Sequence, residues 1–234
     1  MATTRKRVLA LALIASFVLG QYLFIRDLIA QGELPNPIAI HWGFSGEPDG
    51  FSDPTSFLRG ITIVYLVLLV MMAFVGFAVK RRLLRPLLFG FFGFFIVLLA
   101  TIFSVSILVQ VGRSPEEVSV SLWVWVLLLL FPVALVAAIL TSPRVLLRTD
   151  LRIQMLGLTL LKLEFADLTG VREVQLLARD FGGLGIRYSS RTLAFIPRAG
   201  KGVLISTNFG ESVAVRSDTP ELLVSAISAR IEKS

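Results

Sequence analysis

Four apolar runs, each long enough to cross a bilayer, constrain this chain more than any other feature. The hydrocarbon core of a membrane requires about 20 helical residues at roughly 1.5 Å per residue. The runs extend over Val8–Ile29, Gly60–Val79, Pro86–Val111 and Leu122–Leu140. Of the 234 residues, 55% are hydrophobic and 17% are charged, a composition typical of membrane proteins rather than soluble ones. The sequence therefore predicts an α-helical bundle of four transmembrane helices.

The first run follows three cations, Arg5, Lys6 and Arg7, which is also how a secretory signal peptide begins. The run is longer than the apolar region of a signal peptide, and Leu28–Ala30 is a poor match to a cleavage site. We therefore expect a retained first helix.

The charges between the runs predict how the spans are oriented. Cations gather on one side, at Arg5, Lys6, Arg7, Lys80, Arg81, Arg82, Arg85, Arg144 and Arg148. Acidic residues gather on the other side, at Glu33, Glu47, Asp49, Asp53, Glu116 and Glu117. Because cytoplasmic loops are enriched in Lys and Arg, both termini are expected in the cytoplasm and the loop 31–59 outside. The prediction is a multi-pass protein of the cell membrane.

Several chemistries are disfavoured by what the chain lacks. It has no cysteine, which excludes disulfides and thiol nucleophiles. The central turns of the spans hold no ionisable side chain, which disfavours ion-coupled transport and intramembrane proteolysis. The formal net charge of +7 follows from membrane topology, so no nucleic-acid partner is expected. Gln21, Ser104, Ser106 and Gln110 can hydrogen-bond between helices, and Gly90 and Gly93 can permit close approach, although ordinary packing in a four-helix bundle is the favoured reading of these residues.

The loop after the first span reads "LPNPIAIHWGFSGEPDGFSDP", from Leu34 to Pro54. Pro35 and Pro37 require extended geometry at the residues before them. Ile38–Trp42 is then typical of a short strand, and "SGEPDG" is a strong turn signal. We expect a compact loop.

This loop also carries a resemblance. "LPNPIAIHWGFSGEPDGF" resembles the extracytoplasmic motif of bacterial membrane proteins grouped as domain of unknown function 1648, and the likeness covers about Val8 to Val79. That domain is shared with membrane proteins of the sporulation-delaying-toxin immunity type. The resemblance implies a membrane-integral protein with immunity or signalling relatives and no known catalytic activity.

The candidate residues for recognition on the outside are His41, Trp42, Glu47 and Asp49. One histidine among a few carboxylates is a thin ligand set, so no metal and no cofactor are predicted. Another reading places the rings of His41 and Trp42 at the membrane interface and uses the carboxylates, Asp53 among them, to cap turns. A hydrolase is disfavoured because no serine has the setting of a nucleophile.

After Thr141 about ninety residues change to a period of two, seen where Leu161, Leu163 and Phe165 alternate with charged residues. "RAGKG" and "NFG" predict turns between strands. Asp218 or Thr219 can cap a final helix with Pro220 at its first position. Several antiparallel strands closed by a C-terminal helix are predicted.

"GGLGIRY", "GKGVLISTNFGESVAV" and "DTPELLVSAI" resemble the pattern of bacterial pleckstrin-homology-like tails, over about Arg144 to Ile231. The resemblance implies a small β-rich domain, although Leu184 stands where related tails carry an aromatic residue. The spacing of Gly182, Gly183 and Gly185 does not fit a phosphate loop and predicts a tight turn or bulge. Candidate contacts with lipid headgroups or a partner are Arg187, Arg191, Arg198 and Lys201, although a solvated basic face explains them equally well.

The predicted domains are a transmembrane domain, 1–141, and a cytoplasmic β domain, 142–234. The expected function is that of a non-enzymatic membrane sensor, regulator or immunity-like protein. Its outward loop contacts an extracytoplasmic peptide or protein, and its tail engages membrane lipid or another protein. The alternative is an accessory subunit of a transporter or another membrane complex.

Overall fold

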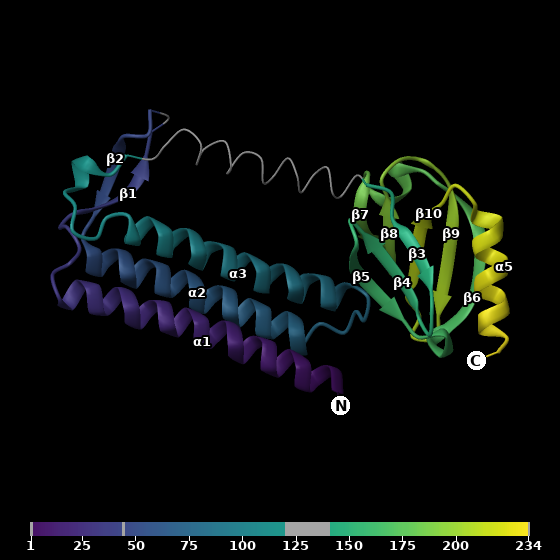
Figure 1. Cartoon of the computed structure of the whole chain (residues 1–234). Coiled ribbons are helices and arrows are strands. Elements are labelled where there is room, and N and C mark those ends of the chain that lie inside the picture. Colours follow the sequence, from purple (N-terminus) through teal and green to yellow (C-terminus); the bar gives the residue numbers. More distant parts are fainter. Residues whose placement is uncertain (1, 44, 120–140, 234) are drawn as a thin grey trace. The chain divides into compact units, whose positions relative to one another are not determined.

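The structure, a computed structural model, describes residues 2–43, 45–119 and 141–233 (Figure 1). Their contacts divide them into two compact units. The helical unit holds the described residues up to Lys80 and those from Arg85 to residue 119. The second unit, which we call the β domain, holds the described residues after 140 together with Arg81–Leu84 from the connection between two helices.

Three helices of the helical unit are long and apolar enough to cross a membrane. They are α1 (Ala2–Ala30), α2 (Pro54–Phe77) and α3 (Leu84–Leu108), which run side by side (Figure 1). They confirm the first three predicted spans. The fourth predicted span, Leu122–Leu140, lies outside the described residues.

Helix α2 begins six residues before its predicted start, and the local sequence explains why. The carboxylate of Asp53 accepts a hydrogen bond from the Ser56 backbone N–H at 2.7 Å, and Pro54 occupies the first turn. An acceptor before the helix and a proline inside its start are both favourable, because the first N–H groups of a helix have no partner within it. Asp53 therefore caps a helix, whereas one reading of the sequence expected it to cap a turn.

Buried apolar residues pack the three helices together, among them Ile25, Tyr65, Met72, Ile96 and Ala100. Polar contacts add to this packing. The Gln21 side-chain amide donates to the Ala100 carbonyl oxygen at 2.8 Å and to Ser104 Oγ at 3.0 Å, which confirms the predicted contact between α1 and α3.

The two glycines of "FGFFGFF" differ in their surroundings. A Cβ on Gly93 would lie 3.1 Å from Ile14 Cδ1 and 3.3 Å from Met72 Cε, so a larger residue would crowd the helix contact. A Cβ on Gly90 would meet no atom of the described residues within 4 Å. Close approach is therefore confirmed at Gly93 and is not seen at Gly90 among the described helices.

A hairpin connects α1 to α2. Strand β1 (Ile38–Trp42) pairs antiparallel with β2 (Pro48–Ser52), with Ala39 opposite Phe51 and His41 opposite Gly50. The predicted strand is confirmed, and the turn "SGEPDG" contributes its last residues to β2. A short 3-10 helix, η1 (Pro115–Glu117), follows α3.

The β domain contains two sheets. The first is a meander of β3 (Arg144–Leu147), β4 (Leu151–Met155) and β5 (Leu158–Leu163). The second has the order β6-β9-β10-β8-β7 and is built from β6 (Leu168–Leu176), β7 (Gly185–Ser189), β8 (Thr192–Ile196), β9 (Gly200–Thr207) and β10 (Ser212–Arg216). Short 3-10 turns, η2 (Phe165–Asp167) and η3 (Ala178–Phe181), flank β6.

Helix α5 (Pro220–Ile231) ends the domain with proline in its first turn, as predicted. Thr219 holds the capping position, although its side chain makes no capping hydrogen bond. The β-rich region with a terminal helix is thus confirmed. One pair of neighbours, β8 and β10, is parallel, whereas only antiparallel strands were predicted. Gly182, Gly183 and Gly185 all have positive φ around the start of β7, which fits the predicted tight turn.

Candidate functional site

A fully buried side chain, Gln110, holds the hairpin against the helical unit. Its Oε1 accepts the Ala39 backbone N–H at 2.7 Å, and its Nε2 donates to the Ala39 carbonyl oxygen at 2.9 Å. Nε2 also donates to the Ser106 carbonyl oxygen at 2.8 Å. The amide therefore pairs with β1 as a neighbouring strand would. Gln110 was predicted to join helices and instead joins a helix to the hairpin.

Trp42 makes a second connection. Its indole Nε1 donates to the Val118 carbonyl oxygen at 2.9 Å, which ties the end of β1 to the segment after α3. The ring is half-buried. The hydrogen bond gives this predicted recognition residue a structural role in positioning the hairpin.

His41 and Asp49 come together across the hairpin. The His41 ring is hydrogen-bonded through Nδ1 to Oδ1 of Asp49. Because an ionised carboxylate only accepts hydrogen bonds, Nδ1 is the donor to Asp49, and Nε2 is the nitrogen left for a further hydrogen bond. The two side chains are 70% and 52% exposed, so the pair faces solvent on a well-defined backbone.

Gly50 makes room for this pair. A Cβ at Gly50 would lie 2.8 Å from His41 Cβ, a distance that side chains do not tolerate. The second glycine of "GEPDG", Gly50, is therefore required opposite His41. A larger residue there would displace the imidazole.

Glu47 is not part of the same contact. Its side chain is exposed in the turn, where its backbone carbonyl oxygen accepts the Gly43 N–H at 2.9 Å and its N–H donates to Ser45 Oγ at 3.4 Å. The structure thus brings together His41 and Asp49 and leaves Glu47 beside them. In the parts of the chain that the structure describes, no three carboxylates or histidines are grouped as a metal site.

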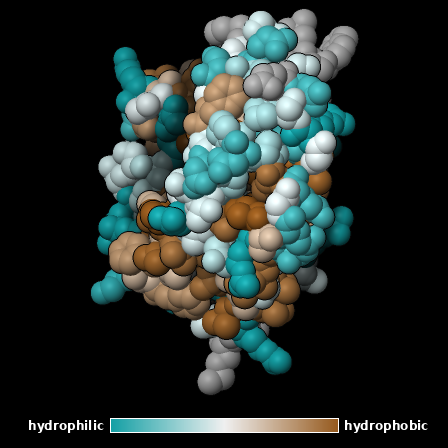
Figure 2. Space-filling model, turned by 90° about the vertical axis from the view of Figure 1, so that its left-hand side faces the viewer, coloured by the Kyte–Doolittle hydropathy of each residue, from teal (hydrophilic) through white to brown (hydrophobic). Residues whose placement is uncertain are grey.

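Apolar side chains are also exposed on the hairpin. Ile40 is 42% exposed and Phe51 is 44% exposed. Viewed onto this end, the surface mixes hydrophilic and hydrophobic residues (Figure 2). Such a mixture is typical of surfaces that contact another molecule, and it also suits a membrane interface.

Two of the four predicted basic residues of the β domain are paired with acids. Arg198 lies 3.2 Å from Asp218, and Lys201 Nζ lies 3.1 Å from Glu173 and 3.3 Å from Glu221. The carboxylates of Glu173 and Glu221 raise the pKa of Lys201. These cations are neutralised within the domain.

The other two cations lie elsewhere. The guanidinium of Arg187, in the middle of β7, packs over the backbone of Gly183. Arg191 lies in the turn between β7 and β8 with a φ of 63°, at the opposite end of β8 from Arg198. The four residues therefore do not converge on one place, and their role in headgroup binding stays a prediction.

A buried carboxylate that the sequence analysis missed lies at the Arg191 end of the β domain. Glu211 accepts the Leu83 backbone N–H through Oε2 at 3.2 Å and the Tyr188 hydroxyl through Oε1. Burial, together with this hydrogen bond to Glu211, raises the pKa of Tyr188 to about 12. Arg82 lies over the ring of Phe209, 5.0 Å from its centre. Within the β domain, the segment Arg81–Leu84 is therefore held through a backbone N–H and a cation.

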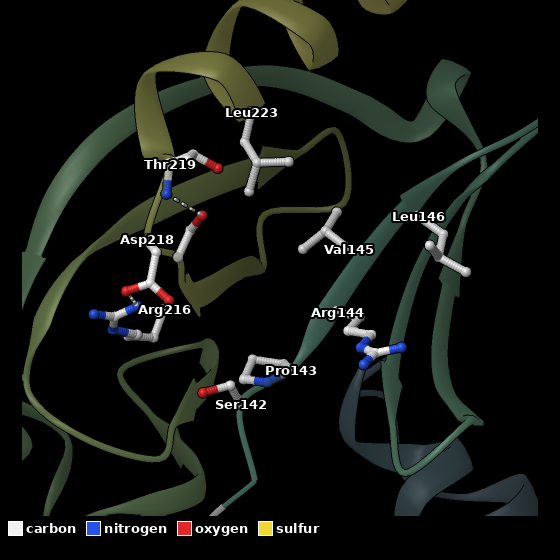
Figure 3. A pocket seen from close by; sticks show the side chains of 10 residues that line it. Ser142, Pro143, Arg144, Val145, Leu146, Arg216, Asp218, Thr219 and Leu223 are labelled. Atoms are coloured by element: carbon white, nitrogen blue, oxygen red, sulfur yellow. Dashed lines mark hydrogen bonds and ion pairs between the residues drawn. The ribbon is translucent and has the colours of Figure 1, made fainter.

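A cavity of about 400 Å³ opens near the start of α5 (Figure 3). Arg216, Asp218 and Thr219 lie along one side of it, and Arg144 and Val145 of β3 lie along the other. Asp218 is ion-paired with Arg216, and this contact lowers the pKa of the Asp218 carboxyl. The basic groups of the cavity are therefore partly satisfied by the domain itself.

One of the comparisons with known proteins, that with protein families, agrees with the resemblance of the first spans. No curated protein and no solved structure matches the chain significantly. Residues 8–66 match the family described as "Domain of unknown function (DUF1648)", so the match covers α1, the hairpin and the first half of α2.

Proposed function

We propose that this chain is a non-enzymatic integral membrane protein of the cell membrane, with both termini in the cytoplasm. In this proposal the hairpin faces outward and recognises an extracytoplasmic peptide or protein. The β domain, a pleckstrin-homology-like module, docks protein or lipid on the cytoplasmic side. The role is that of a sensor, regulator or immunity-like protein.

The observation that carries the proposal is the contrast between the anchored and the exposed residues of the hairpin. Gln110 pairs with the backbone of Ala39, and Trp42, next to the turn, donates a half-buried hydrogen bond to Val118. Between these two contacts along β1, His41 pairs with Asp49 of β2, and both side chains are exposed. A surface that is ordered before its partner arrives loses little conformational entropy on binding, which favours affinity.

The β domain supports the second half of the proposal. Glu211 binds a main-chain N–H of Leu83, and the neighbouring Phe209 ring accepts the cation of Arg82. Hydrogen bonding to a backbone N–H and a cation over an aromatic ring are both contacts that can hold a basic segment of a partner protein. Protein docking is therefore the use of the domain that its described contacts favour.

Crosslinking in intact cells tests whether the hairpin contacts a partner outside the cell. A photoreactive residue in place of Glu47 should capture a specific partner, since Glu47 is exposed beside the His41–Asp49 pair. Gly50→Ala should abolish this capture, because it displaces His41 while leaving every charge in place. Glu33→Gln is the matched control, as Glu33 is exposed on the segment before β1. Equal capture by the G50A and parent proteins would contradict the proposal.

The identity of the captured partner and a separate activity assay distinguish the alternatives. Stoichiometric capture of a permease or an ATPase would instead assign the chain as an accessory subunit. In the activity assay, a hydrolytic activity lost in both His41→Ala and Glu47→Ala would assign it as an enzyme.

A further inference from the structure

Two arginines meet at the end of the helical unit opposite the hairpin, which we call the basic end. Arg7 lies in the first turns of α1, and Arg85 lies in the first turn of α3. They are close enough for each charge to repel the other. Arg7 Nη1 donates to the Gly76 carbonyl oxygen of α2 at 3.2 Å, so the pair is built from all three helices.

The helices approach closely at this place. A Cβ on Gly76 would lie 2.9 Å from the Phe89 ring, so α2 and α3 are in direct contact one turn from Arg85. Arg7 and Arg85 are both only partly exposed. The Nε atom of Arg85 is buried and makes no hydrogen bond to the described residues. Packing therefore holds two like charges together and leaves a donor unused.

Nothing in the neighbouring sequence supplies a counter-charge. No Asp or Glu occurs in residues 1–26 or 54–115, and the acids of the described helical unit lie at its hairpin end. Two partly buried guanidinium groups without a carboxylate are unfavourable, because the desolvation of each charge is not compensated. An anion from outside the helical unit would remove this penalty.

We propose that Arg7 and Arg85 bind the phosphate of an anionic membrane lipid between α1, α2 and α3. The planar guanidinium group presents paired donors that match phosphate oxygens. The apolar faces of the same helices contact the acyl chains. Basic pockets between transmembrane helices on the cytoplasmic side are known to take such headgroups.

Lipid binding to the full-length protein in detergent tests this site. Phosphatidylglycerol is titrated in, and native mass spectrometry reads the bound lipid. Arg85→Gln and Arg7→Gln should each weaken binding about tenfold, because each removes a charge-assisted contact. Arg5→Gln and Lys6→Gln remove the same charge from exposed positions on α1 and should change binding less than about twofold.

Two further binding measurements test whether the bound phosphate belongs to a lipid. Phosphatidylcholine should bind more weakly, and inorganic phosphate should not displace phosphatidylglycerol. Arg85→Lys keeps the positive charge and loses the paired donors of the guanidinium group, so intermediate lipid binding is expected from a protein that folds normally. The proposal is overturned if R5Q or K6Q weakens binding as much as R85Q, if R85Q binds like the parent, or if inorganic phosphate competes.

Discussion

The two ends of the helical unit treat their polar groups in opposite ways. At the hairpin end, Gln110 satisfies both backbone groups of Ala39, and His41 is paired with Asp49. At the basic end, the charges of Arg7 and Arg85 repel each other, and the sequence of the helical unit has no acidic residue at this end. The first arrangement is complete within the chain, and the second is completed only by something outside the helical unit.

The β domain resembles the hairpin end in this respect. Asp150 is almost fully buried and is paired with Arg152 and Lys162, while Lys201 is paired with two glutamates. A cation alone is therefore a poor indicator of a binding site. A cation held close to another cation, with no acid near it, is a better one.

The contrast between the two ends of the helical unit would be lost if Gln110 could be removed at little cost in stability. Gln110→Ala leaves the buried Ala39 N–H and C=O without partners, at about 1–3 kcal/mol for each group. We expect the hairpin to detach while the helices stay folded, seen as fast hydrogen exchange of the Ala39 amide. Gln31→Ala is the control, since the Gln31 amide contacts only the exposed Asp27.

Glu211→Ala should have the next largest effect. It leaves the buried Leu83 N–H without an acceptor, at about 1–3 kcal/mol. The melting temperature of the full chain should fall, and the pKa of Tyr188 should move down from about 12, although burial keeps it above its ordinary value. Spectrophotometric titration of Tyr188 checks the second point. Glu232→Ala, at an exposed position, should change neither quantity.

The smallest expected effect is on the stability of the β domain at low pH. The hydrogen bond from Arg152, with help from Lys162, lowers the pKa of the Asp150 carboxyl to about 2. A lowered pKa in the folded state stabilises the fold above the ordinary pKa of aspartate and loses this effect as pH falls through the folded value. The difference in melting temperature between the parent and Asp150→Asn should be constant above about pH 5 and should shrink between about pH 4 and 2. A difference that does not depend on pH would show that the ion pairs contribute nothing.

Much of the fold could be predicted because periodicity and turn residues are local signals. The three described spans follow from run length, and β1 follows from the extended run between Pro37 and the glycine-rich turn. The helix start at Asp53–Pro54 was missed although its capping signal is local, because only the apolar run was used. The parallel pairing of β8 with β10 depends on contacts distant in sequence, which no short pattern encodes.

The sites were predicted less well for the same reason. His41 and Asp49 were singled out as neighbours in one loop, and they do pair. Gln110 binds Ala39 and Glu211 binds Leu83 across at least 70 positions, and Arg7 and Arg85 are as far apart in the sequence. No local pattern therefore indicated these pairs. Only the two arginines had a wider signal, the absence of acids from the basic loops, which was used only to orient the spans.

The most direct test of the account is the side of the membrane on which each region lies. Because the chain has no cysteine, Asp49→Cys and Lys201→Cys each provide a single site for a membrane-impermeant maleimide. The account predicts labelling of D49C in intact cells and labelling of K201C only after the membrane is opened. Labelling of K201C in intact cells, with D49C protected, would contradict it.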